Sequence, residues 1–97
     1  MRKPIRVLVV DDSAFARKVL RETLSAAQIE VVGFARDGLE ALEQIATLSP
    51  DVVTLDLMMP NLDGLGVLRG LPKENPPRVV VVSISSGESE RGVEALQ

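Results

Sequence analysis

The chain has 97 residues, which is enough for one domain with a single core and too few for a second domain. Its formal net charge of -3 gives no basic field for DNA or RNA, and with two Phe and neither Trp nor Tyr it lacks platforms on which bases stack. The absence of cysteine and histidine excludes disulfides, thiolate or imidazole metal ligands, and catalysis by either residue. The composition therefore favours an aliphatic core and hard oxygen-ligand chemistry.

The amino terminus does not have the pattern of an export signal. Met1–Arg6 carries positive charges, but the apolar run that follows is short and ends in two aspartates. No stretch of the sequence approaches the roughly 18 apolar residues that are needed to span a membrane. We therefore expect a cytoplasmic protein that binds neither a membrane nor nucleic acid directly.

The first predicted strand is Ile5–Val10, which is rich in β-branched residues and apolar on both faces after Arg6. This pattern is typical of a parallel strand that helices cover on both sides. Ser13 is the candidate N-cap of the next helix. The apolar positions that recur at helical spacing in that helix are Ala16, Val19, Leu20, Leu24 and Ala27.

The second predicted strand is Glu30–Ala35, and the helix after it has Asp37 as its candidate N-cap and ends before a Ser-Pro pair. The apolar positions of this helix are Leu39, Leu42, Ile45 and Leu48. The third predicted strand is the apolar run that begins at Val52, delivers Asp56 to its carboxyl end and stops at Pro60.

The second half of the chain continues the alternation with shorter elements. Turn formers after the proline predict a loop and then a helix of about two turns, in which Leu65 and Leu68 face the core. Arg78–Val82 is the strongest β run of the chain, and Ser83 follows at its carboxyl end. Glu88–Gln97 begins a further helix.

These elements predict an α/β fold with a doubly wound parallel sheet. Each pair of successive strands is separated by a helix-bearing segment longer than the dozen or so residues that a parallel crossover needs. Asp11 and Asp12 end the first strand and Asp56 ends the third, and these acids meet only if the two strands are neighbours. The expected strand order is therefore 2-1-3-4, with the acids at a topological switch point.

Three convergent carboxylates indicate a hard cation. Asp11, Asp12 and Asp56 repel one another unless a proton or a cation neutralises them, and Mg²⁺ is the cation that fits best. The backbone carbonyl of Met58 is a further candidate ligand. Because Mg²⁺ needs only one or two carboxylates and keeps several waters, an oxygen of Asp56 is able to act as nucleophile and form an aspartyl phosphate. Ser83 is able to donate a hydrogen bond to the phosphoryl group.

A simpler interpretation stays open for each position taken alone. Asp11 and Asp12 are also compatible with a plain turn and N-cap after a strand. Asp56 is compatible with a solvated loop, and Ser83 with an ordinary loop serine. Two acidic strand ends, followed by a hydroxyl at a third, favour the functional interpretation.

Four segments carry a family resemblance: Val7–Ser13, Ala35–Leu42, Asp56–Pro60 with Asp63-Gly64, and Val79–Ser83. Together they resemble the receiver domain of two-component response regulators. The resemblance implies a flavodoxin-like fold and phosphotransfer from a histidine kinase to Asp56. The metal ligands that it implies for Mg²⁺ are Asp11, Asp12, Asp56 and the Met58 carbonyl. It further implies that Ser83 engages the phosphoryl group and takes part in switching.

Within that family, Asp12–Arg17, Val52–Asp56 and Val82–Ser85 are most similar to the amino-terminal receiver of chemotaxis protein-glutamate methylesterases. In those enzymes a separate domain with a Ser-His-Asp site is inhibited by the unphosphorylated receiver. We expect residues 1–97 to form one receiver domain that stops before the family's fifth strand, with its lysine, and fifth helix. Lys73 lies in a loop before the fourth strand and does not match that lysine.

The same family resemblance implies which partners the chain has. We expect a histidine kinase as phosphodonor and an effector domain or partner protein as output. Without a fifth strand, Arg78–Val82 is an open sheet edge that invites self-association. Two other functions stay open: a Mg²⁺-dependent phosphohydrolase that acts through an aspartyl phosphate, and an interaction module that never takes phosphate.

Overall fold

Four parallel strands form one sheet in the order β2-β1-β3-β4. The computed structural model describes residues 3–57 and 64–82. Its strands are β1 (Arg6–Val10), β2 (Glu30–Ala35), β3 (Val52–Leu55) and β4 (Arg78–Val81). Neighbouring strands all run parallel, so the predicted doubly wound α/β fold and its strand order are confirmed.

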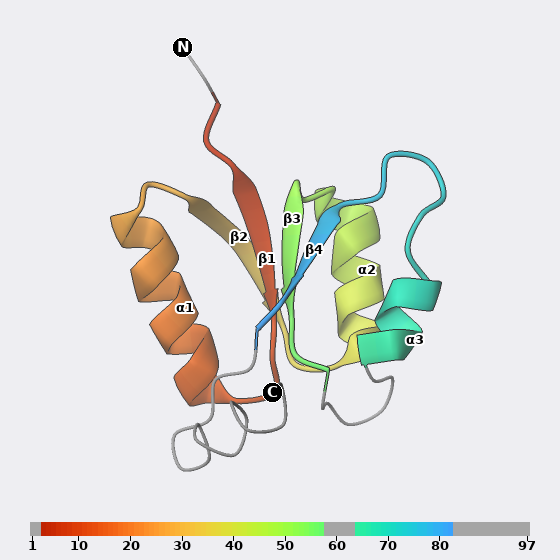
Figure 1. Ribbon diagram of the computed structural model, residues 1–97, viewed down its shortest axis with the longest axis horizontal. Helices are drawn as coiled ribbons and strands as arrows, with labels where there is room; N and C mark the ends of the chain where they lie inside the picture. Colours follow the sequence, from red (N-terminus) through yellow and green to blue (C-terminus); the bar gives the residue numbers. More distant parts are fainter. Residues whose placement is uncertain (1–2, 58–63, 83–97) are drawn as a thin grey trace, which may run out of the picture.

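Helices cover both faces of this sheet (Figure 1). On one face, α1 (Ala14–Ala26) packs on β1 and β2, whereas α2 (Gly38–Leu48) and α3 (Gly64–Arg69) lie on the other face. The central strand β1 is therefore covered on both sides, as its continuous apolar sequence predicted. In the described part of the chain, no helix has the length and apolar character needed to cross a membrane.

The core is aliphatic and lies on the α2 side of the sheet. Its largest buried cluster joins three strands and two helices: Leu8, Val10, Ala35, Ala41, Ile45, Val53, Leu55 and Val67. Burying one Val or Leu side chain of this kind stabilises the fold by about 1.5–3 kcal/mol. These contacts hold β1 and β3 side by side, which brings their carboxyl ends to the same edge.

The pairing of β1 with β2 slips by one residue between Val7 and Leu8. Beyond the slip, Val10 pairs with Ala35. The carbonyl oxygen of Ala35 then accepts a hydrogen bond from the backbone N–H of Asp11 at 2.9 Å. The bulge thus ties the first residue after β1 to the end of β2.

Both predicted N-caps are confirmed. Ser13 Oγ accepts a hydrogen bond from the N–H of Ala16 at 3.2 Å, and Asp37 Oδ1 accepts one from the N–H of Glu40 at 2.8 Å. Glu40 accepts a hydrogen bond from the N–H of Arg36 at 3.2 Å, in a variant of the capping box. Each cap satisfies a donor that the first helical turn leaves unpaired and contributes about 1 kcal/mol.

The prediction that Leu65 and Leu68 face the core is wrong. These side chains are 56% and 38% exposed, whereas Gly64 and Val67 are buried. A Cβ atom at Gly64 would lie only 2.7 Å from Cα of Leu57, so glycine lets the start of α3 approach the chain after β3 closely. This close approach turns the side of the helix with Val67 inward and both leucines outward.

The apolar stripes of the longer helices are narrower than predicted. Ala27 is exposed and serves as the C-cap of α1 rather than as a packing residue. Leu39 is 57% exposed, because the buried row of α2 consists of Gly38, Ala41 and Ile45. The two small residues of this row let α2 approach the sheet closely, and Leu39 lies outside it.

The strand predicted over Arg78–Val82 is confirmed as β4, which ends one residue earlier. Val80 and Val81 are 50% and 54% exposed, and in the described part of the chain β4 pairs only with β3. The helix predicted over Glu88–Gln97 lies outside the described residues.

Thr54 is a buried polar residue in the middle of β3. Its side chain is 6% exposed and lies in register between Val9 of β1 and Val80 of β4. Among the described residues, its Oγ1 is the one buried side-chain nitrogen or oxygen atom without a hydrogen-bond partner. An unsatisfied buried hydroxyl costs about 1–3 kcal/mol relative to its hydration in water. Thr54 therefore weakens the strand that delivers Asp56.

We predict that Thr54→Val raises the free energy of unfolding by about 1 kcal/mol, because valine keeps the shape and removes the unsatisfied hydroxyl. Urea unfolding followed by circular dichroism measures the change. Thr47→Val is the matched control, since the exposed Thr47 donates a hydrogen bond from Oγ1 to the carbonyl of Glu43 at 2.9 Å. A Thr54→Val variant no more stable than the parent would contradict the prediction.

Candidate functional site

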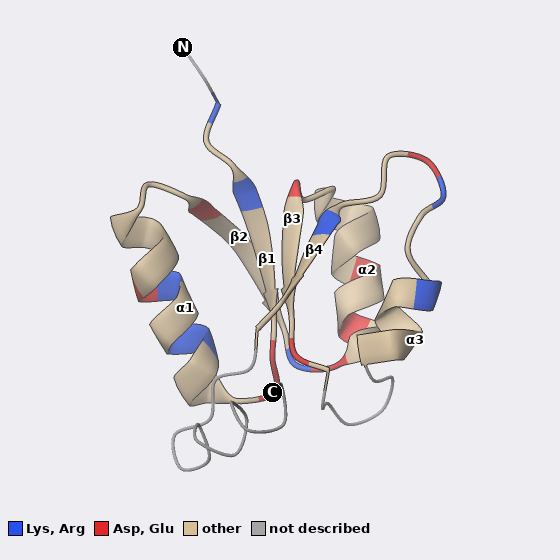
Figure 2. Ribbon diagram, in the orientation of Figure 1, with Lys and Arg blue, Asp and Glu red and all other residues tan. Residues whose placement is uncertain are grey.

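The acidic residues singled out in the sequence lie at one edge of the sheet, beyond the carboxyl ends of β1 and β3 (Figure 2). The pairing of Val10 with Leu55 places the residues after these strands next to each other. The backbone N–H of Asp56 donates to the carbonyl of Val10 at 3.0 Å, which extends the ladder one residue beyond β3. Asp11 and Asp56 are therefore positioned by backbone hydrogen bonds to neighbouring strands.

The three carboxylates converge as the sequence predicted. One oxygen each from Asp11, Asp12 and Asp56 lies within 4.8 Å of the other two. Asp11 is 2% exposed, Asp56 is half-buried and Asp12 is exposed. The cluster therefore runs from the interior to the surface and is accessible from solvent at Asp12 and Asp56.

Burial raises the pKa of Asp11 above its ordinary value. The N–H of Ser13 donates to Asp11 Oδ1 at 2.9 Å and opposes this rise, because the bond favours the charged carboxylate. The negative charges of Asp56 and Asp12 raise the pKa further, and the guanidinium of Arg17 lowers it. Desolvation dominates, so the cluster favours a proton or a cation at Asp11.

Arg17 is a further residue of this site, and the sequence patterns assigned it no role there. Its Nη1 donates a hydrogen bond to the backbone carbonyl of Asp11 at 2.8 Å. Arg17 lies on the second turn of α1, and the Ser13 cap fixes where that helix begins. The helix therefore directs one positive charge toward the acidic cluster.

Two predicted site residues lie outside the described residues. They are Met58, whose carbonyl was expected to bind metal, and Ser83, expected to contact the phosphoryl group. Their roles stay predictions.

Residues 7–97 match the model of the response regulator receiver domain. The chain belongs to this family. It is 71% identical over 96 residues to protein-glutamate methylesterase/protein-glutamine glutaminase 5 of Myxococcus xanthus, covering 97% of this chain and 28% of that protein. The receiver therefore corresponds to little more than a quarter of this relative.

Solved structures agree with this assignment. The response regulator domain of Thermotoga maritima CheB superposes with a TM-score of 0.78 at 48% identity, covering 97% of this chain and 72% of that one. A chain of the CheX-CheY-BeF3-Mg²⁺ complex from Borrelia burgdorferi superposes with a TM-score of 0.70 at 25% identity, covering 96% of this chain and 89% of that one. The predicted flavodoxin-like receiver fold and the resemblance to methylesterase receivers are confirmed.

We predict that Asp11→Asn removes a pH-dependent loss of stability. Because the folded state raises the pKa of Asp11, the folded chain keeps this proton to a higher pH than the unfolded chain, for which the pKa is about 3.9. Ionisation of Asp11 therefore destabilises the fold progressively as the pH rises from that value through the raised pKa. As the pH rises across this range, the free energy of unfolding of Asp11→Asn should therefore increase relative to that of the parent.

Urea unfolding at a series of pH values in metal-free buffer measures this gain. Asp51→Asn provides the control, because it removes an equal charge from an exposed side chain at the opposite ends of the strands. A difference between Asp11→Asn and the parent that stays constant with pH would show that Asp11 is not responsible.

Proposed function

We propose that this receiver domain accepts a phosphoryl group on Asp56. The observation that carries the proposal is the convergence of one oxygen from each of three carboxylates within 4.8 Å. Of the three, Asp11 is almost completely buried and is held by the N–H of Ser13, whereas Asp56 is half-buried at the end of β3. Asp56 thus combines a fixed backbone with access for a reacting group.

The donor set fits Mg²⁺, because three carboxylate oxygens at this spacing are hard ligands for a small divalent cation. We propose that Asp11, Asp12 and Asp56, with the carbonyl of Met58, hold the ion. When bound, Mg²⁺ would supply positive charge that stabilises the transferring phosphoryl group. The similarity to a chain of a complex that contains BeF3 and Mg²⁺ supports Mg²⁺ as the ion.

The proposed phosphodonor is the phosphohistidine of a histidine kinase. A carboxylate oxygen of Asp56 attacks the phosphorus, an O–P bond forms and the P–N bond breaks. The electron pair of that bond stays on the imidazole nitrogen, which takes a proton from solvent. Ser83 donates a hydroxyl hydrogen bond to a phosphoryl oxygen, and Arg17 keeps the Asp11 backbone in place through the hydrogen bond to its carbonyl.

The proposed output is a protein-glutamate methylesterase domain in the same polypeptide. The support is the high identity to a methylesterase of which the matched receiver is 28%. In this proposal phosphorylation of Asp56 relieves inhibition of that domain in the cytoplasm. The receiver itself catalyses only its own phosphorylation.

We predict that Asp56→Asn abolishes phosphorylation, because an amide is not a nucleophile toward phosphorus. The parent, incubated with Mg²⁺ and a small acyl phosphate, should gain the mass of one phosphoryl group, whereas the variant should not. Asp51→Asn, with the same change at an exposed aspartate, should still gain it. A mass gain in Asp56→Asn would contradict the assignment of Asp56 as phosphoacceptor. Continuous phosphate release by the parent would favour a phosphohydrolase. No reaction of the parent would favour an interaction module that is never phosphorylated.

We also predict that Mg²⁺ stabilises the fold by relieving repulsion among the three aspartates. At a tenfold excess over its dissociation constant the linkage gain is about 1.4 kcal/mol. Asp12→Ala should weaken this gain and raise the stability of the metal-free chain, because it removes one of the crowded charges. Melting curves of the parent that coincide with and without Mg²⁺ would count against a metal site.

We further propose that β4 pairs with a second chain. Val80 and Val81 are half exposed on a strand that pairs, among described residues, only with β3. Sedimentation of the parent should show self-association. Val80→Lys should weaken this association, because a charged side chain opposes pairing at the sheet edge. Leu65→Lys, on the exposed side of α3, is the control and should not weaken it. A parent that stays monomeric at high concentration would rule this pairing out.

A further inference from the structure

Helix α1 carries a positive stripe although the whole chain has a net charge of -3. The stripe consists of Arg17, Lys18 and Arg21. Arg21 follows Lys18 by three residues and Arg17 by four, so it shares one side of the helix with both. Figure 2 shows these charges as blue bands on α1. Like charges at this spacing destabilise an isolated helix, so the stripe has a cost in the free chain.

None of these three cations forms an ion pair within the described residues, where the one salt bridge joins Arg36 to Glu40. Arg17 has its hydrogen bond to the Asp11 carbonyl, and no described carboxylate lies within ion-pair distance of Lys18 or Arg21. Lys18 and Arg21 therefore carry positive charge that no described carboxylate pairs with, and such charge on one side of a helix favours the binding of a negatively charged ligand.

Two adjoining cavities lie beside this stripe, between α1 and the edge strand β2. The first, of about 230 Å³, is lined by Ala14, Phe34 and all three cations. The second, of about 430 Å³, is lined by Arg21, Ile29 and Val31 together with Ser25, Gln28 and Glu30, so this end of the surface carries one carboxylate beside the Arg21 cation. Arg21 lines both cavities, and we call the two together the α1–β2 groove. Apolar side chains accompany the charged ones along its whole length.

We propose that the α1–β2 groove binds an extended acidic segment of a partner protein, in which acidic and apolar residues alternate. The acidic side chains pair with the α1 stripe, and the apolar ones contact Phe34, Ile29 and Val31. From Ala14 to Ser25 a helix rises about 17 Å, which about five extended residues span. The proposal does not depend on phosphorylation of Asp56, because it rests on Lys18 and Arg21, which line the groove and are not part of the acidic cluster.

A peptide fits this groove better than the alternatives. Drug-sized ligands occupy pockets of about 300–1,000 Å³ that enclose them, whereas the groove is open and elongated. Nucleic acid needs a larger basic field and more stacking platforms than one Phe and three cations provide. Acidic and apolar side chains on one short segment satisfy both kinds of lining residue.

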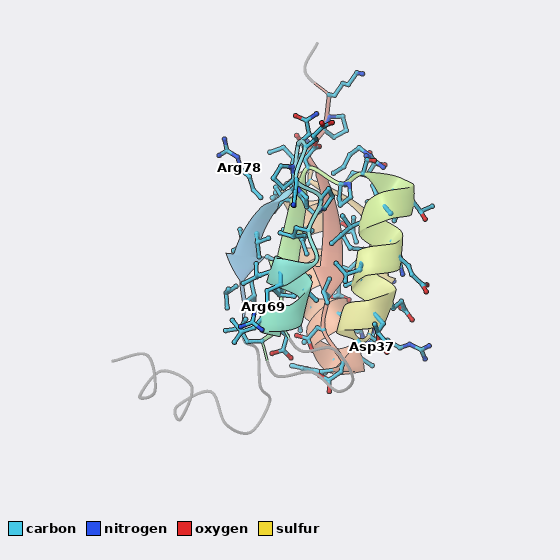
Figure 3. All side chains as sticks on the ribbon, turned by 90° about the vertical axis from the view of Figure 1, so that its right-hand side faces the viewer. Asp37, Arg69 and Arg78 are labelled. Carbon is cyan, nitrogen blue, oxygen red and sulfur yellow. The ribbon has the colours of Figure 1, made fainter. Side chains whose placement is uncertain are left out.

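The test uses a fluorescent hexapeptide in which Glu and Val alternate, with binding to the full chain followed by anisotropy. We expect binding that weakens at least tenfold in Arg21→Glu, weakens also in Lys18→Glu, and declines with added salt. The matched control is Arg69→Glu, the same charge reversal on the exposed Arg69 of α3, across the sheet from α1, which should bind like the parent (Figures 1 and 3). Circular dichroism establishes that each variant is folded.

Other outcomes overturn the proposal. These are no binding by the parent, equal binding by the parent and by both groove variants, or equal affinity for a hexapeptide in which Gln replaces Glu. A single-stranded oligonucleotide that binds the parent more tightly than the acidic hexapeptide, and loses affinity in Arg21→Glu, would assign the groove to nucleic acid instead.

Discussion

Repulsion among three carboxylates is the constraint around which this domain is built. The register of β1 and β3 forces one oxygen each of Asp11, Asp12 and Asp56 within 4.8 Å, and two of these residues follow directly after core strands. The chain has no histidine or cysteine to share a metal site, so the cluster selects a hard cation or a proton. The same repulsion that destabilises the free fold favours the binding of a cation at this edge.

The rest of the scaffold opposes that repulsion. A buried aliphatic cluster spans β1, β2 and β3 and keeps the strand ends together. The slip in the pairing of β1 with β2 lets the Ala35 carbonyl hold the backbone of Asp11, and Arg17 holds the carbonyl of the same residue. Such hydrogen bonds contribute about 1 kcal/mol each, so the acids are held by several weak restraints rather than by one strong one.

Helix α1 contributes to two different surfaces. Its first turn is set by the Ser13 cap, and from there Arg17 reaches the acidic cluster. The same residue lines the α1–β2 groove together with Lys18 and Arg21. The amino-terminal part of this positive side therefore lies beside the acidic cluster, and the remainder lines the α1–β2 groove. Its opposite, apolar side packs on the sheet and holds both surfaces in place.

The sequence by itself determined the strands, their order, both N-caps and the acids that meet, because β-type runs, capping side chains and acidic strand ends are signals carried by neighbouring residues. Only the tertiary structure decided that Val67 rather than Leu65 is buried, since the close approach of Gly64 to Leu57 rotates α3. It also decided that Arg17 reaches the Asp11 carbonyl and that α1 and β2 leave a groove between them. These features depend on distances between elements far apart in the chain, and such distances are set by how side chains pack rather than by any local pattern.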